Sequence, residues 1–150
     1  MPGTVTLRPS SDADATWIAE LRAVVMRPDL ERLGRFDPVW VRERFLRAFV
    51  PANTRLIEVD GETAGSIAVR PEPAGHAEPR EYWLEHFYID DAHRGRGLGT
   101  GVLRRVLAEL ADGRPVRLNV LQGSPARRLY ERHGFVFERE DEVDVWLVRE

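Results

Sequence analysis

The sequence predicts an α/β (α+β) domain in which helices cover the faces of a mixed β-sheet. Its 150 residues, 43% hydrophobic and 31% charged, fit one domain spanning residues 1–150. Strand-like and helix-like patterns follow one another in the order β-α-α-β-β-β-α-β-α-β-β. An Asp60-Gly61 pair between two β-rich runs predicts a tight hairpin, so part of the sheet should be antiparallel.

The first fifty residues predict one strand and two helices. Alternating residues indicate a strand over 4–8, and a helix follows that Ser11 or Asp12 caps. Pro28 is expected to end this helix, because proline has no N–H to continue it. Residues 27–35 carry both signs of charge and predict an exposed connection. The apolar positions at helical spacing are Trp17, Ile18, Leu21, Val24 and Val25.

A second helix and the hairpin come next. Asp37-Pro38 combines an N-cap with a first-turn proline, and Pro51 ends the helix. Two β-rich runs, over 54–59 and 64–70, flank the hairpin turn and should pair antiparallel. The apolar stripe of this helix is Val41, Phe45, Leu46 and Phe49. Three tryptophans are predicted to lie in the core: Trp17, Trp40 and Trp146.

The second half of the chain predicts more strands and two more helices. Prolines and a glycine indicate a loop over 71–79. Residues 81–89 predict a strand, in which the contiguous apolar residues 87–89 indicate a bulge or burial on both faces. An amphipathic helix begins near Gly99, and a short helix begins at Ser124-Pro125. The remaining strands are predicted over 116–121, 135–137 and 143–148.

Composition excludes several classes of chemistry. With 22 basic and 25 acidic residues the net charge is −3, so the protein's field would repel a nucleic acid. All the basic residues are arginines, which excludes Schiff-base catalysis by lysine, and the absence of cysteine excludes disulfides and a cysteine nucleophile. No apolar stretch could span a membrane and no signal peptide is visible, so we expect a cytoplasmic protein without nucleic-acid or membrane partners.

One glycine-rich segment has the properties of an anion site. No acidic residue occurs between Ala92 and Ala108, where four arginines stand in a chain that is negative overall. Glycines at 95, 97 and 99 follow a strand and open a helix, so backbone N–H groups and the helix dipole could bind a pyrophosphate. The glycine patterns of dinucleotide-binding and P-loop proteins do not fit, because the glycine spacing differs and there is no lysine.

Two motifs in this half of the chain resemble those of the GNAT superfamily of N-acetyltransferases. Arg94-x-x-Gly97-x-Gly99 resembles the superfamily's acyl-CoA pyrophosphate loop. Downstream, Asn119 on a strand and the run from Ser124-Pro125-Ala126 through Leu129-Tyr130 to Gly134-Phe135 resemble its second signature. Ser124 stands where asparagine is commoner, and serine caps a helix about equally well.

The resemblance implies a mostly antiparallel sheet of six to seven strands flanked by about four helices. It implies acetyl-CoA as co-substrate, with the pantetheine arm along Phe87, Tyr88 and Ile89. The residues that it assigns to the pyrophosphate are Arg94, Gly95, Arg96, Gly97, Leu98, Gly99 and Thr100. Asn119, Ala126 and Tyr130 complete the implied cofactor-binding set. The first fifty residues, where the superfamily builds its acceptor site, match only as a strand and two helices.

The resemblance also implies an acid for the reaction. Tyr130 matches a tyrosine that the family places near the thioester sulfur. Its reference pKa of about 10 exceeds the roughly 8.5 of a thiol, so it could protonate a departing thiolate. The alternative is that Tyr130 only packs its helix against the sheet.

Three alternatives stay open for the general base. Glu85 lies on the strand where the family often places a base, and alternation puts it on one face with Trp83 and Phe87. A carboxylate among aromatic rings suits proton removal through a water, although it could instead be an edge carboxylate paired with arginine. His86, on the opposite face, is the next candidate, and a route through solvent alone is the third.

These residues predict an acetyl-CoA-dependent N-acetyltransferase that acts by direct transfer within a ternary complex. The acceptor is expected to be the primary amine of a small molecule or peptide, and the protein a possible homodimer. The alternative is a non-catalytic acyl-CoA-binding or regulatory module of the same fold. No metal is expected, because His76, His93 and His133 share no ligand spacing.

Overall fold

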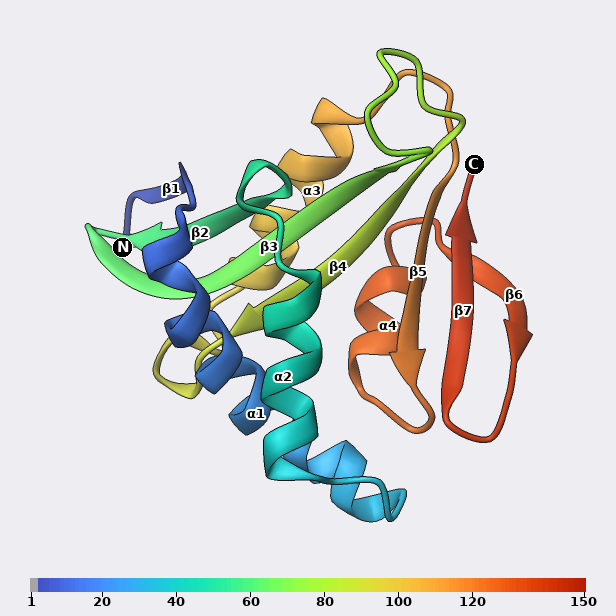
Figure 1. Ribbon diagram of the computed structural model, residues 1–150. Coiled ribbons are helices and arrows are strands. Elements are labelled where there is room, and N and C mark those ends of the chain that lie inside the picture. The colour runs from blue at the N-terminus through green and yellow to red at the C-terminus, as the bar shows by residue number, and fades with distance from the viewer. Residues whose placement is uncertain (1–2) are drawn as a thin grey trace. The chain divides into compact units, whose positions relative to one another are not determined.

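Within the described part of the chain, seven strands form one mixed sheet in the order β1-β2-β3-β4-β5-β7-β6 (Figure 1). The structure is a computed structural model that describes residues 3–150. The strands are β1 (Val5–Pro9), β2 (Thr54–Val59), β3 (Glu62–Glu72), β4 (Glu81–Ile89), β5 (Val116–Leu121), β6 (Val136–Glu140) and β7 (Asp144–Arg149). The pairs β1–β2, β2–β3, β5–β7 and β6–β7 are antiparallel, whereas β4 and β5 are parallel.

The same part of the chain also forms four α-helices: α1 (Ala15–Arg32), α2 (Pro38–Ala48), α3 (Leu98–Glu109) and α4 (Ala126–Glu131). Three short 3-10 turns join them to the strands: η1 (Asp12–Asp14), η2 (Pro51–Asn53) and η3 (Asp91–His93). This set of elements confirms the predicted fold class and the predicted element order. Over residues 3–150, no helix has the length and apolarity needed to cross a membrane.

The described residues group into two compact units, to which β3 and β4 each contribute a different part of the strand. The first unit consists of residues 3–68 and 86–99, and the second of residues 69–85 and 100–150. Each unit is described by itself below. A single domain over residues 1–150 stays a prediction.

The hairpin of the first unit forms as predicted. Asp60 and Gly61 both have left-handed backbone, with φ of 51° and 81°, and Val59 pairs with Glu62 across the turn. Two positive φ angles in a two-residue loop give a turn whose twist matches that of the strands. Helices α1 and α2 lie side by side in this unit (Figure 1). The core beneath them includes Ile18, Ala19, Leu21, Phe45, Leu56 and Tyr88.

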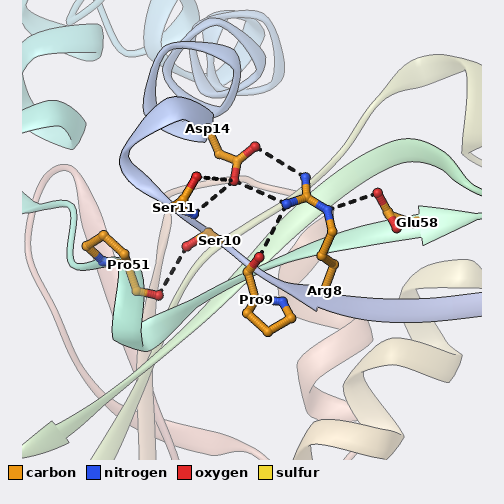
Figure 2. Close-up of polar contacts among 7 residues, drawn as sticks. All are labelled: Arg8, Pro9, Ser10, Ser11, Asp14, Pro51 and Glu58. Atoms are coloured by element: carbon orange, nitrogen blue, oxygen red, sulfur yellow. Dashed lines mark hydrogen bonds and ion pairs between the residues drawn. The ribbon is translucent and has the colours of Figure 1, made fainter.

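A network of polar contacts joins β1, β2 and the start of α1 (Figure 2). Ser11 and Asp14 form a capping box around η1, in which the Ser11 N–H donates to Asp14 at 2.9 Å. Arg8 donates to Asp14 at 3.2 Å and to Glu58 on β2 at 3.0 Å. The guanidinium lowers the pKa of the Asp14 carboxyl, chiefly through this hydrogen bond. Ser10 Oγ also donates to the Pro51 carbonyl at 3.1 Å.

The structure corrects the predicted end of α1. The helix continues through Pro28 to Arg32, so the predicted exposed connection over 27–35 is mostly helical. Pro28 cannot donate to the Val24 carbonyl, but the turn that follows is stabilised in other ways. Leu30 is only 3% exposed in the core, and ion pairs join Arg27 to Glu31 and Arg32 to Asp29. Burial of one leucine and two local ion pairs therefore offset the lost hydrogen bond.

Several predicted core residues prove to be exposed. Trp17 is 38% exposed, Trp40 is 47% exposed and Leu46 is 45% exposed. The predicted stripe of α2 is correct at Val41 and Phe45, which are fully buried. An 11-residue helix on the surface of the unit buries a narrow stripe, and Trp40 lies outside it with Arg44 over its ring. Trp146 is partly buried, and the guanidinium carbon of Arg139 lies over its ring, 3.7 Å from the ring centroid.

The second unit contains β5, β7 and β6, with β7 between the other two (Figure 1). Its strands bury Val116, Leu118, Val145 and Leu147, each at most 2% exposed. The helix predicted to begin near Gly99 is amphipathic as expected, because α3 buries Val102, Leu103, Val106 and Leu107. Ser124 Oγ accepts a hydrogen bond from the Ala126 N–H at 3.2 Å, so it supports the start of α4 as predicted.

Candidate functional site

The glycine segment links the end of β4 to the start of α3. Its first turn is anchored to the sheet, because the Asp90 N–H donates to the Ala64 carbonyl at 2.9 Å. His93 is 7% exposed, and its Nδ1 lies 2.7 Å from the Asp90 carboxylate. Arg94 Nε donates to the Ile89 carbonyl at 3.2 Å and pairs with Asp91. These contacts hold residues 90–94 in place at the start of the segment. None of them involves the glycines that follow.

Two glycines adopt the conformation that an anion-binding loop needs. Gly95 and Gly97 have φ of 77° and 72°, and both are exposed. A Cβ on either would meet no heavy atom within 4 Å, so the space beside this backbone is open. The first N–H groups of α3, from Leu98 onward, have no partner within the helix and carry the positive end of its dipole. Open backbone, helix N-terminus and neighbouring arginines fit a diphosphate.

The first unit also holds a buried polar cluster formed by Arg22, His86 and Tyr88. Arg22 lies on α1 and is only 6% exposed, and its Nε donates to the Val41 carbonyl at 2.9 Å. Its Nη1 donates to Tyr88 Oη at 3.0 Å and lies 3.5 Å from His86 Nδ1. Tyr88 Oη and His86 Nδ1 are 3.2 Å apart. Two residues of β4 that were predicted separately are thus brought together by an arginine from a distant helix.

The backbone of β4 is irregular at the same place. His86 has a φ of 49°, which is rare for a residue other than glycine and costs about 1–2 kcal/mol. Ser66 Oγ donates to the His86 carbonyl at 2.8 Å and supports this conformation. The irregularity directly precedes Phe87, where the sequence indicated a bulge. Strict alternation between Glu85 and Phe87 therefore does not hold.

Tyr88 also approaches β3 closely. A Cβ on Gly65 would lie 2.1 Å from the Tyr88 carbonyl oxygen, so only glycine fits at this position. Absence of a side chain there allows the backbone of β4 to keep its position at the residues predicted to bind pantetheine. The glycine inside a β-rich run was the available signal for this close approach.

Glu85 is paired with an arginine in the second unit. Arg70 Nε lies 3.3 Å from Glu85 Oε1, and the same guanidinium pairs with Glu72 and lies over the Trp83 ring. The Glu85 side chain is 31% exposed. The arginine-paired alternative therefore describes its surroundings, and an aromatic ring is present as well. This carboxylate has a cationic partner and access to solvent.

The residues of the second signature have definite partners in the same unit. Tyr130 is 8% exposed, and its ring packs edge-to-face against Phe135 at 5.7 Å. Asn119 is exposed, and its amide donates to Asp144 at 2.9 Å. The Ala126 N–H donates a hydrogen bond to Ser124 Oγ. Within the part of the chain that is described, no three histidine or acidic side chains gather in a way that could hold a metal.

A family comparison accounts for these motifs. The model of the acetyltransferase (GNAT) domain matches residues 50–137, more than half of the chain. The chain belongs to the GNAT family of acetyltransferases. The match includes β2 to β5, the glycine segment, α3 and α4, and thus both motifs of the sequence.

Individual relatives of this GNAT protein extend the comparison. The spermine/spermidine N(1)-acetyltransferase of Bacillus subtilis (strain 168) is 39% identical over 62 residues, 39% of this chain and 41% of that protein. The chain thus matches less than half the length of this relative. An acetyltransferase from Thermus thermophilus superimposes with a TM-score of 0.74 at 22% identity over 99% of both chains. The PaiA N-acetyltransferase from Thermoplasma acidophilum, solved with coenzyme A, has a TM-score of 0.73 at 18% identity, over 98% of this chain and 99% of that one.

Sequence reasoning missed one residue of the buried polar cluster, Arg22. It lies four residues after Ile18, on the buried stripe of α1, where a charged residue breaks the apolar pattern. A buried arginine requires polar partners, and those partners come from α2 and β4. The sequence shows the anomaly but does not show which distant residues resolve it.

Proposed function

We propose that this GNAT protein is an acetyl-CoA-dependent N-acetyltransferase that acetylates the primary amine of a small molecule or peptide by direct transfer. The observation that carries the proposal is the glycine segment, with its open left-handed backbone at the start of α3. A loop of this form binds a diphosphate through N–H groups. Coenzyme A carries such a group.

Residues 94–100 would hold the diphosphate, and the backbone of Phe87, Tyr88 and Ile89 would hold the pantetheine arm. The positive φ at Gly97 and the open space beside it leave room for the ligand. Bound acetyl-CoA would supply an activated acyl group. A backbone N–H of β4 would stabilise the negative charge that develops on the acyl oxygen.

Proton transfers would fall to side chains. Tyr130 would donate a proton to the leaving thiolate, for which the ordinary acidity of a tyrosine is suitable. One of three candidates would take the proton from the attacking amine: Glu85, which is paired with Arg70, or His86, or solvent. The direct route follows from the absence of cysteine, which leaves no thiol to form an acyl-enzyme.

The acceptor is proposed only as a class. The Bacillus relative is named as an enzyme of spermine and spermidine, so these polyamines belong in the first amine panel. Small primary amines and short peptides with free amino termini complete the panel. Release of coenzyme A would be followed with a thiol reagent and the acetylated amine identified by mass spectrometry. Tight binding of coenzyme A without turnover of any amine would favour the non-catalytic module.

Substitution of Gly97 tests the cofactor site. Gly97→Val should abolish stabilisation by coenzyme A, because its side chain would occupy the space proposed for the diphosphate. In the native protein, a ligand at a concentration of 100 times its Kd raises the free energy of unfolding by about 2.7 kcal/mol. This corresponds to an increase of about 5–10 °C in Tm.

Gly75→Val is a matched control for the Gly97 variant. Gly75 has a φ of 76° and equally open surroundings, so both variants carry the same backbone strain. Only the Gly97 variant should lose the shift in Tm that coenzyme A produces. If both variants keep the native shift, the diphosphate lies elsewhere and the proposed site is wrong.

A further inference from the structure

We propose that Arg22 and Tyr88 hold the imidazole of His86 in its neutral form with the proton on Nε2. Both are positioning residues for the ring. In this form His86 offers a hydrogen-bond donor at Nε2 and is not the general base. The ring state is independent of the proposed function, whereas its consequence for proton transfer rests on that function.

The hydrogen-bonding capacities of the three side chains lead to this assignment. A guanidinium only donates, so Arg22 Nη1 gives one proton to Tyr88 Oη at 3.0 Å. The tyrosine hydroxyl then has its own proton to donate. His86 Nδ1 lies 3.2 Å away and the thioether sulfur of Met26, a weak acceptor, 3.8 Å away. The nitrogen is the better acceptor, so Nδ1 carries the lone pair.

The position of Arg22 disfavours the opposite arrangement. Its Nη1 lies 3.5 Å from His86 Nδ1, so a proton on Nδ1 would place one donor against another. A doubly protonated ring would in addition place a second cation beside the first, inside the protein. Both effects leave Nδ1 without a proton.

The geometry is held from several elements. Arg22 cannot swing away easily, because it is 6% exposed and its Nε is bound to the Val41 carbonyl of α2. The Phe45 ring meets the imidazole edge-on at 4.9 Å. Ser66 Oγ holds the His86 carbonyl, where the backbone is left-handed. The ring state is therefore built into the packing of α1, α2, β3 and β4.

The consequence concerns the choice among the three base candidates. A neutral imidazole has one lone pair, and here Nδ1 uses it toward Tyr88 and Arg22. The only lone pair of the ring is thus turned toward these two residues, and Nε2 presents a donor, which cannot take a proton from an amine. In the proposed reaction the base is accordingly Glu85 or solvent.

Long-range ¹H–¹⁵N NMR spectra of the full chain at pH 7.5 test the ring state directly. Two other histidines provide internal references: His133 Nδ1 lies 2.8 Å from the Leu129 carbonyl, and His93 Nδ1 2.7 Å from a carboxylate. These partners only accept, so both rings should be protonated at Nδ1. The resonances of His86 are identified because they disappear in His86→Gln. They should show the opposite pattern, with the proton on Nε2. Protonation of His86 at Nδ1, or at both nitrogens, would overturn the proposal.

Arg22→Met tests whether the arginine holds the ring. Methionine keeps the bulk of the arginine side chain and removes its hydrogen-bond donors. The ¹⁵N chemical shifts of the two ring nitrogens of His86 should therefore move toward the average of two exchanging tautomers. His93 and His133 should not change, and Arg27→Met on the exposed side of α1 should leave all the rings as they are. An unchanged His86 pattern in Arg22→Met would show that Arg22 does not hold the ring.

Tyr88→Phe replaces Arg22→Met if that variant does not fold. It keeps the aromatic ring and removes the hydroxyl proton that Nδ1 accepts, so the Nδ1 resonance of His86 should shift. An unmoved resonance would overturn the role of the hydroxyl. All these spectra are recorded without coenzyme A or amine. A failure of the proposed function would appear only in the binding and turnover assays.

Discussion

Tyr130 combines a packing role with a proposed chemical one, and the two can be separated. Its ring is 8% exposed and packs against Phe135, whereas the proton transfer needs only the hydroxyl. A residue of this kind is well suited to a conservative substitution. The same holds for Tyr88, whose ring lies in the core while its hydroxyl serves Arg22 and His86.

Tyr130→Phe should lower kcat by roughly 10²-fold or more, because the acid for the thiolate is lost. The affinity for coenzyme A should change little, since the phenyl ring keeps its packing. Steady-state kinetics and isothermal titration measure the two quantities. Tyr82→Phe, which removes a hydroxyl bound to Asp112, is the control and should leave kcat unchanged. Native turnover in Tyr130→Phe would show that Tyr130 only packs.

Asp14 carries a testable pH dependence. Its pKa is lowered, first by the hydrogen bond from Arg8, so its folded-state value lies below the unfolded value of about 3.9. A lowered pKa contributes stability that is present above the unfolded value and is lost as the pH falls through the folded one.

Asp14→Asn should therefore lower the free energy of unfolding at pH 7 by about 0.5–1 kcal/mol, a small effect because Arg8 is 40% exposed. Urea unfolding at pH 7 and at lower pH measures the difference, which should shrink below about pH 4. Asp12→Asn, an exposed residue of the same turn, should have no such effect. A difference that is equal at all pH values would contradict the role of the carboxylate charge.

At the scale of elements, α1 shows how packing overrides a local signal. Proline inside a helix removes one hydrogen bond and crowds the preceding turn, yet α1 continues for four residues beyond Pro28. Helix α2 has its proline at the first position, where no N–H is needed. Proline thus destabilises the interior of α1 but fits the first position of α2.

Pro28→Ala should stabilise the protein by about 1–2 kcal/mol, because alanine restores the N–H toward the Val24 carbonyl; the greater freedom of the unfolded chain offsets part of the gain. Denaturant midpoints measure the effect. Pro38→Ala is the matched control, and no gain is expected there. Equal responses of the two variants would mean that Pro28 causes no strain in α1.

For the whole molecule, composition determines the kind of reaction that can occur. Without cysteine or lysine, neither a thioester nor a Schiff base can form on the protein. Initial velocities with acetyl-CoA and an amine should give intersecting lines, as direct transfer in a ternary complex requires. Parallel lines would indicate an acyl-enzyme and contradict direct transfer. The cytoplasmic location and the homodimer remain predictions.

Local signals predicted the fold and the place of the glycine segment well. The hairpin at Asp60-Gly61, the start of α2 at Asp37-Pro38 and the glycine segment each depend on what a few neighbouring residues require of their own backbone. The residue type alone indicates which local conformation is favoured, because glycine tolerates positive φ and aspartate caps a helix. The fold class and the position of the glycine segment between a strand and a helix could therefore be predicted from the sequence alone, whereas its binding of a diphosphate stays a prediction.

Contacts between distant residues were decided only in the tertiary structure. Arg22 becomes a partner of His86 because α1 packs beside β4, and these residues are 64 positions apart. Gly65 is required because Tyr88 lies against it, and Pro28 is tolerated because Leu30 is buried. No local preference encodes these effects, since each depends on which surfaces meet when apolar area is removed from water.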